Sequence, residues 1–115
     1  MHEIGMLQDA VDLAIEQASA HGMRRIEQMT FRIGVDSGVV PDVIEFAFDV
    51  ITKETIAAGA RLVIEPVPLG YTCRRCNCEY TVDCTTTAPI CPQCDGRDLV
   101  VSQGREFVLH SVQGA

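Results

Sequence analysis

The sequence predicts a small α+β fold, a mixed domain of two helices and roughly three strands with a zinc-ribbon module inserted between two of the strands. Three observations support this prediction. Apolar residues recur at helical spacing in two stretches, they alternate with polar residues in others, and two Cys-x-x-Cys pairs stand before the last alternating stretch. The 115 residues suffice for one ordinary domain, or for a small core with a metal-stabilised module.

Residues 4–20 are expected to form an amphipathic helix. Its apolar positions recur at steps of three and four residues: Ile4, Leu7, Val11, Ala14, Ile15 and Ala18. Glu3 suits the positive end of the helix dipole, and Gly22 can adopt the left-handed conformation that closes a helix. His21 is therefore interpreted as a residue of the helix end and not as a metal ligand.

A second helix is expected to begin at Pro41, which suits the first helical turn. Its apolar side is predicted to contain Val43, Ala47, Val50 and Ile51. Phe46 and Phe48 widen this apolar surface, and the simplest interpretation of both is packing in the core. The helix is thus expected to be covered on more than one side.

Three stretches are expected to form strands. In the first, four apolar residues that alternate with polar ones predict one buried face: Met29, Phe31, Ile33 and Val35. Residues 60–67 form the second, and residues 105–112 the third. His110 alternates with its neighbours and is interpreted as an ordinary strand residue.

The stretch from Cys73 to Cys94 carries the most specific pattern. Cys73 and Cys76 form one pair, Cys91 and Cys94 form the other, and fourteen residues separate them. Each pair can close a tight turn that points both sulfur atoms at one centre, as a tetrahedral structural zinc site requires. A short, polar segment seldom folds on its own core, so the metal would supply folding energy.

This pattern divides the chain into two expected domains. Residues 1–69 plus 103–115 would form the α/β domain, and residues 70–102 the zinc-ribbon module. A disulfide scaffold is the alternative, but it would belong to an oxidising compartment, and the acidic N-terminus lacks the features of a signal peptide. We therefore expect reduced thiols in the cytoplasm, with Cys78 and Cys84 free and outside the zinc pattern.

Composition and motifs argue against several function classes. No apolar run approaches the length of a membrane span, and a formal charge of −7 disfavours a nucleic-acid partner. The sequence contains no phosphate-binding glycine loop, GxSxG or HExxH motif. A zinc ion with four thiolate ligands has no open position for water. We therefore expect a protein that is not an enzyme.

The N-terminus offers a second set of metal ligands. The amine of Met1 and the backbone nitrogen and imidazole of His2 can chelate one metal in a plane, with Glu3 as a further donor. A planar, nitrogen-rich set favours Ni(II) or Cu(II). Taken alone the pattern is weak, because chain ends fray and a terminal histidine is usually solvated.

Together these features resemble the HypA family, including its HybF branch, the nickel metallochaperones of [NiFe]-hydrogenase maturation. The segments that carry the resemblance are Met1-His2-Glu3, Ile33-Gly34, Phe46-Ala47-Phe48, Gly59-Ala60, the two cysteine pairs and Gln103-Gly104-Arg105-Glu106. The combination of the opening tripeptide with a zinc ribbon is specific, whereas neither feature is specific alone.

The resemblance implies two metals with different roles. Ni(II) would bind transiently at the N-terminus, with His2 as the essential ligand and Glu3 assisting, and Zn(II) would be structural on Cys73, Cys76, Cys91 and Cys94. It also implies partnership with the companion GTPase HypB and delivery to the hydrogenase large subunit. In some family members the same system also supplies urease.

Two other functions compete with nickel delivery. The same four cysteines can hold iron, as in a rubredoxin-like electron carrier. Zinc ribbons also serve as nucleic-acid adaptors, although the acidic charge disfavours that function here.

Overall fold

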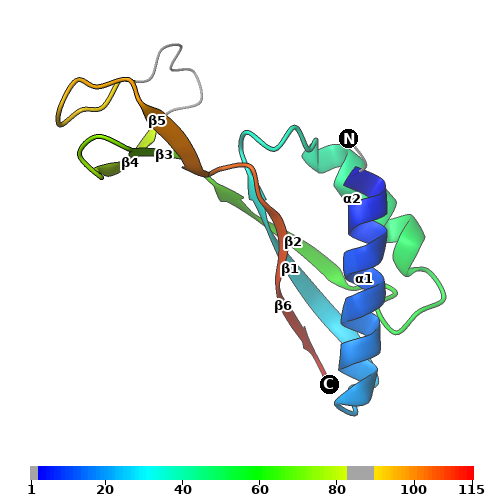
Figure 1. Cartoon of the computed structure of the whole chain (residues 1–115). Coiled ribbons are helices and arrows are strands. Elements are labelled where there is room, and N and C mark those ends of the chain that lie inside the picture. The colour runs from blue at the N-terminus through cyan, green and yellow to red at the C-terminus, as the bar shows by residue number, and fades with distance from the viewer. Residues whose placement is uncertain (1–2, 83–89) are drawn as a thin grey trace. The chain divides into compact units, whose positions relative to one another are not determined.

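The computed structural model describes residues 3–82 and 90–115. Its elements follow the predicted order of helix, strand, helix, strand, inserted module and returning strand, so the expected α+β fold is confirmed (Figure 1). The inserted module adds three strands for which no residues had been predicted. The chain divides into two compact units, and each is described by itself. The helix–sheet unit comprises Met1–Arg32, Val39–Glu65 and Val108–Ala115, and the cysteine unit comprises Ile33–Gly38 and Pro66–Phe107. Within the described ranges, neither helix combines the length and the apolar character of a membrane span.

Helix α1 (Glu3–Ala20) forms as the periodicity predicts. Its buried side is made by Leu7, Val11, Ala14 and Ala18. Ile4, expected on this side, is 51% exposed. At the other end Gly22 has φ +81°, and Nδ1 of His21 lies 2.8 Å from the carbonyl oxygen of Gln17. The interpretation of His21 as a helix-end residue is therefore confirmed.

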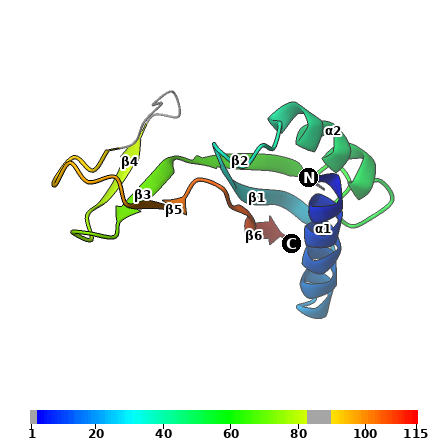
Figure 2. The same ribbon diagram turned by 45° about the horizontal axis from the view of Figure 1, so that its top comes forward.

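A three-stranded sheet in the order β2-β1-β6 carries the two helices on one face, as Figures 1 and 2 show. Its strands are β1 (Ile26–Gly34), β2 (Arg61–Val67) and β6 (Phe107–Gly114). The β1 side chains Met29, Phe31 and Ile33 are buried as predicted. Val35 lies beyond the end of the strand and is 47% exposed, so its predicted burial is wrong.

Helix α2 (Pro41–Thr52) begins at the predicted proline, but its faces differ from the prediction. The buried side is made by Ile44, Ala47, Phe48 and Thr52. Phe46, predicted to lie in the core, is 74% exposed. The physical reason is helix geometry, because residues two apart lie about 200° apart around the axis. Phe46 and Phe48 therefore cannot share one face.

In the cysteine unit, β3 (Leu69–Cys73) is the centre of an antiparallel sheet with β4 (Glu79–Val82) and β5 (Leu99–Gln103). Tyr71 pairs with Tyr80 across β3 and β4, and their ring centroids are 5.9 Å apart. The register between β3 and β5 shifts at Gly70 and Tyr71. Because β3 ends at Cys73, the sheet carries the chain directly into the first cysteine pair.

The same unit contains a close backbone crossing near the motif residues at 103–106. The N–H of Gly34 donates to the carbonyl oxygen of Glu106 at 2.8 Å, and the N–H of Asp36 donates to that of Gly104 at 2.8 Å. A side chain on Gly34 would collide with the backbone of Gly104. Arg105 Nε also lies 2.9 Å from Asp36 Oδ2. Glycine is therefore required at position 34 because two chain segments touch there.

Candidate metal centre

Each cysteine pair lies in a tight backbone turn, and the two turns are built alike. In the first, the N–H of Asn77 donates to the carbonyl oxygen of Cys73 at 2.8 Å, and the N–H of Cys73 donates to that of Cys78 at 2.9 Å. Asn77 has φ +61°, a conformation that asparagine tolerates better than most residues. We call residues 73–78 the first knuckle.

The second knuckle, residues 91–96, repeats this pattern at equivalent positions. The N–H of Asp95 donates to the carbonyl oxygen of Cys91 at 2.9 Å, and the N–H of Cys91 donates to that of Gly96 at 2.9 Å. Asp95 has φ +57° and thus corresponds to Asn77. In both knuckles, the asparagine or aspartate that follows the second cysteine supplies the left-handed residue that folds the sulfur-bearing turn.

The two knuckles bring four thiols together. The Sγ atoms of Cys73, Cys76, Cys91 and Cys94 all lie within 4.8 Å of one another. The Cys73–Cys94 and Cys76–Cys91 sulfur distances are both 3.6 Å. A disulfide would need about 2.05 Å, whereas a tetrahedron with metal–sulfur bonds of about 2.3 Å has sulfur–sulfur edges of about 3.8 Å. The spacing therefore fits four ligands around one metal ion.

The thiols of this cluster differ in acidity. Burial opposes ionisation of Cys91, but backbone N–H groups of Cys94 and Gln93 and the Cys76 thiol lower the pKa of Cys91 to about 6. At Cys76 the N–H of Cys78 favours the thiolate, but burial and the other three thiols raise the pKa to about 12. One thiolate thus opposes formation of a second, and a bound cation would remove that opposition.

Cys78 lies next to the cluster but does not belong to it. Its Sγ points to the carbonyl oxygen of Glu79 at 3.9 Å, and burial together with the nearby cluster thiols raises the pKa of Cys78. Cys84, the other cysteine outside the predicted pattern, lies outside the described residues. Among residues 3–82 and 90–115, the four-cysteine cluster is the one group of this kind that could hold a metal.

The second predicted metal site is described only at one residue. Glu3 opens helix α1, where its carboxylate lies in the first turn. Met1 and His2 lie outside the described residues. The nickel ligands therefore remain a prediction from the sequence.

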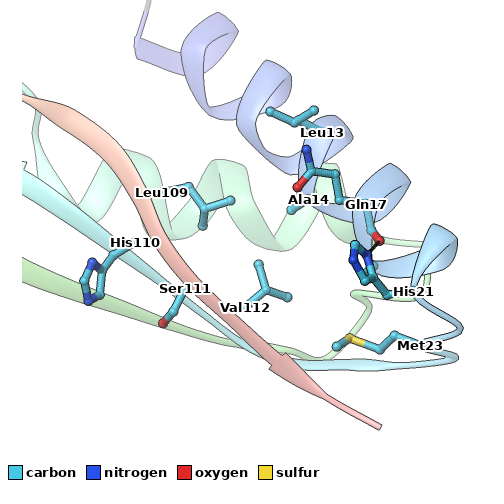
Figure 3. A pocket seen from close by; sticks show the side chains of 10 residues that line it. Leu13, Ala14, Gln17, His21, Met23, Leu109, His110, Ser111 and Val112 are labelled. Carbon is cyan, nitrogen blue, oxygen red and sulfur yellow. Dashed lines mark hydrogen bonds between the residues drawn. The ribbon is translucent and has the colours of Figure 1, made fainter.

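A groove of about 370 Å³ lies between α1 and β6 in the helix–sheet unit. Leu109 and Val112 point into it from the strand, whereas His110 points away (Figure 3). The strict alternation predicted for this strand is therefore incomplete. His21 also borders the groove, but neither histidine joins a group of metal-binding side chains in the described part of the chain.

Sequence reasoning missed several residues that shape the metal centre. It did not identify Asn77 and Asp95 as the left-handed residues of the two turns, although each follows a cysteine pair at the same spacing. That repeated spacing was the available signal, since asparagine and aspartate are enriched at positive φ. The contact of Gly34 with Gly104 had no comparable local signal, because seventy positions separate them in the chain.

Comparisons with known proteins agree over the length of the chain. A family model described as "Hydrogenase/urease nickel incorporation, metallochaperone, hypA" matches residues 1–114. The hydrogenase maturation factor HypA of Geobacter metallireducens is 41% identical over 113 residues, covering 98% of each protein. HypA of Chloroflexus aurantiacus is 36% identical over 116 residues, again with 98% of each covered.

Solved structures agree on the fold. The solution structure of the Ni metallochaperone HypA from Helicobacter pylori has a TM-score of 0.72 at 23% identity, covering 99% of this chain and 97% of that one. A second solution structure of a HypA protein has a TM-score of 0.81 at 22% identity, covering 100% and 97%. At these identities the structures support the fold, and the family follows from the sequence matches. The chain belongs to the HypA family of hydrogenase maturation factors.

Proposed function

We propose that this member of the HypA family carries Ni(II) at its N-terminus, holds Zn(II) in its cysteine cluster, and delivers nickel for [NiFe]-hydrogenase maturation. The observation that carries the proposal is the four-thiol cluster within a chain that matches a nickel metallochaperone family over residues 1–114. Proteins of hydrogenase maturation are therefore its expected partners. We propose the GTPase HypB and the hydrogenase large subunit, with urease maturation proteins as a further destination.

The proposed zinc ligands are Cys73, Cys76, Cys91 and Cys94. Their spacing supports a closed tetrahedral site, and such a site stabilises structure and leaves no position for a substrate or water. The lowered pKa of Cys91 supplies one thiolate near neutral pH, and the ion would favour ionisation of the others. A closed zinc site supports a role without enzymatic catalysis.

The proposed nickel ligands are the amine of Met1, the backbone and imidazole nitrogens of His2, and Glu3. Chelation by adjacent nitrogens of one chain end gives a planar set that suits Ni(II). The position of Glu3 at the start of α1 supports this proposal, because it follows directly on the two residues that carry the nitrogen donors.

We assign the two proposed metal sites to two different domains of the chain. Residues 1–69 plus 103–115 would form the nickel-binding domain, and residues 70–102 the zinc-ribbon module. The proposed compartment is the cytoplasm, where thiols stay reduced.

Metal analysis of the untagged protein tests the nickel site. His2→Ala should abolish specific nickel binding while zinc content stays at one ion per chain. His21→Ala and His110→Ala are matched controls, because they remove an imidazole elsewhere and should leave nickel binding intact. A tag fused to Met1 should also abolish binding, since it converts the amine into an amide. Tight binding of one nickel ion by His2→Ala, or by the fused chain, would exclude this site.

The cluster geometry also fits iron, which four thiolates bind in an electron carrier. A ferric four-thiolate site is red, whereas zinc is colourless. A colourless protein with one zinc ion would support the proposed structural role. A red protein with stoichiometric iron would favour the rubredoxin-like alternative.

A further inference from the structure

Helix α2 presents two parallel rows of exposed side chains on the side away from the core. One row is apolar and consists of Val43, Phe46 and Val50. The other is acidic and consists of Asp42, Glu45 and Asp49. Each row has the spacing i, i+3 and i+7, which aligns side chains along one stripe of a helix. We call these six residues the α2 outer face.

The apolar row is exposed to a degree that core packing does not explain. Phe46 is 74% exposed, Val50 52% and Val43 38%, whereas Ile44 and Phe48 on the same helix are buried. Single exposed apolar residues are ordinary on protein surfaces, but a contiguous exposed row rimmed by polar residues is typical of an interaction site.

The acidic row restricts what can cover this surface. Helix α2 contains no lysine or arginine, and the helix–sheet unit as a whole has ten acidic and five basic residues, a formal charge of −5. Phosphate-bearing partners, such as nucleic acid or an anionic membrane, would be repelled. A second copy of the chain would bring one acidic row close to another at a cost in free energy. Charge complementarity therefore selects a basic protein surface.

We propose that the α2 outer face docks a basic amphipathic helix of a partner protein, one that presents bulky apolar residues beside a row of lysines or arginines. The twelve residues of α2 span about 18 Å, which matches about three turns of a partner helix. Apolar rows would pack between the helices, and the basic row would pair with Asp42, Glu45 and Asp49. The proposal goes beyond the proposed function, because it uses neither the cysteine cluster nor Met1-His2-Glu3.

A synthetic peptide tests the proposal on the zinc-loaded full chain. The probe is a 14-residue stapled helix with a leucine row and an adjacent lysine row, and anisotropy measures its binding. Amide chemical shifts are expected to change along α2. Phe46→Ala should weaken binding at least about tenfold, as loss of a central aromatic contact does. Leu13→Ala is the matched control, because Leu13 is an apolar residue of α1 with 53% exposure.

A charge-reversal experiment provides a second test of the docking proposal. A double variant, Glu45→Lys with Asp49→Lys, should no longer bind the lysine peptide. It should instead bind a peptide in which glutamates replace the lysines. Equal binding by a peptide of scrambled order would overturn the proposal, as would shifts centred on the groove between α1 and β6. Dimers that form through α2 without any peptide would also overturn it. Nickel content of Phe46→Ala should equal that of the native chain, so failure here is distinguishable from failure of the nickel site.

Discussion

The two units of this protein are stabilised by different means. The helix–sheet unit buries large apolar side chains such as Leu7, Phe31 and Phe48 almost completely. In the cysteine unit, the described core residues are three aliphatic side chains and two cysteines: Ile33, Val67, Leu69, Cys73 and Cys91. A core of that size contributes little burial energy, so the free energy of folding of this unit must come largely from a bound metal.

This difference predicts that the two units are destabilised by different treatments and substitutions. Chelators and cysteine variants should act on the cysteine unit, and changes to apolar side chains should act on the helix–sheet unit. The largest loss of stability is expected in the cysteine unit, where a single bound ion does the work of an apolar core.

Removal of a cysteine ligand should unfold the cysteine unit. Structural zinc supplies on the order of 10–16 kcal/mol in small finger peptides, so Cys73→Ala or Cys94→Ala should remove most of its stability. Amide signals of β3, β4 and β5 should lose their dispersion while those of α1 keep theirs. Cys78→Ser is the control, because Cys78 lies outside the cluster and its replacement should leave zinc bound. Stoichiometric zinc in both alanine variants would refute the four-thiolate assignment.

In the helix–sheet unit, the two phenylalanines of α2 should differ sharply. Phe48 is 1% exposed, and Phe48→Ala should cost about 3–5 kcal/mol of unfolding free energy. Phe46→Ala removes the same atoms from a largely exposed position and should stay within about 0.5 kcal/mol of the native chain. Urea unfolding followed by far-UV circular dichroism measures both. Similar losses for the two variants would mean that the outer face of α2 is covered.

A fall in pH should weaken nickel binding while zinc stays bound. The terminal amine titrates near 7.7–8.0 and imidazole near 6.5, so protons compete with nickel at both groups as pH falls from 8 to 6. Nickel affinity should drop at least about a hundredfold over this range, and further where the backbone nitrogen of His2 loses its proton on binding. Zinc should stay bound over the same range, because its four thiolates form a separate, closed site that does not use the amine or the imidazole. Calorimetric titration at several pH values tests this, and a constant nickel affinity would exclude amine and imidazole ligands.

Modest effects are predicted at the backbone crossing of Gly34 and Gly104. Gly34→Ala introduces a methyl group where the Gly104 backbone lies, and it should cost about 1–3 kcal/mol as overpacking does. Arg105→Ala removes only an exposed ion pair with Asp36 and should cost less than about 1 kcal/mol. Thermal unfolding of the two variants measures the difference. An unaltered midpoint for Gly34→Ala would show that the crossing can widen without loss.

The sequence predicted those features whose signals are local. Helix α1 and the cysteine pairs follow from spacing alone, because a helical period and a tight turn each involve neighbours within a few residues. The error at Phe46 has a physical cause. Hydrophobicity alone placed it in the core, although its position two residues from Phe48 puts it on the opposite side of α2.

Contacts between residues that are far apart in the chain could not be predicted from the sequence. The approach of Gly34 to Gly104 and the pairing of Arg105 with Asp36 are set by the path of the whole chain. Ile33-Gly34 and Gln103-Gly104-Arg105-Glu106 are among the segments that carry the family resemblance, but the resemblance does not explain their residues. The structure explains two of them, because Gly34 permits the backbone contact and Arg105 forms the ion pair beside it.

The two knuckles are one backbone design used twice. Exchanging Cys73 with Cys91 and Cys76 with Cys94 converts one 3.6 Å sulfur contact into the other, as a local two-fold axis would. Each hexapeptide carries its own pair of sulfur atoms and its own left-handed residue. The first also donates a hydrogen bond to another segment, from the N–H of Arg74 to the carbonyl oxygen of Asp98 at 2.9 Å. Copying the second into the place of the first would keep the sulfur positions but put a proline, which has no N–H to donate, at position 74.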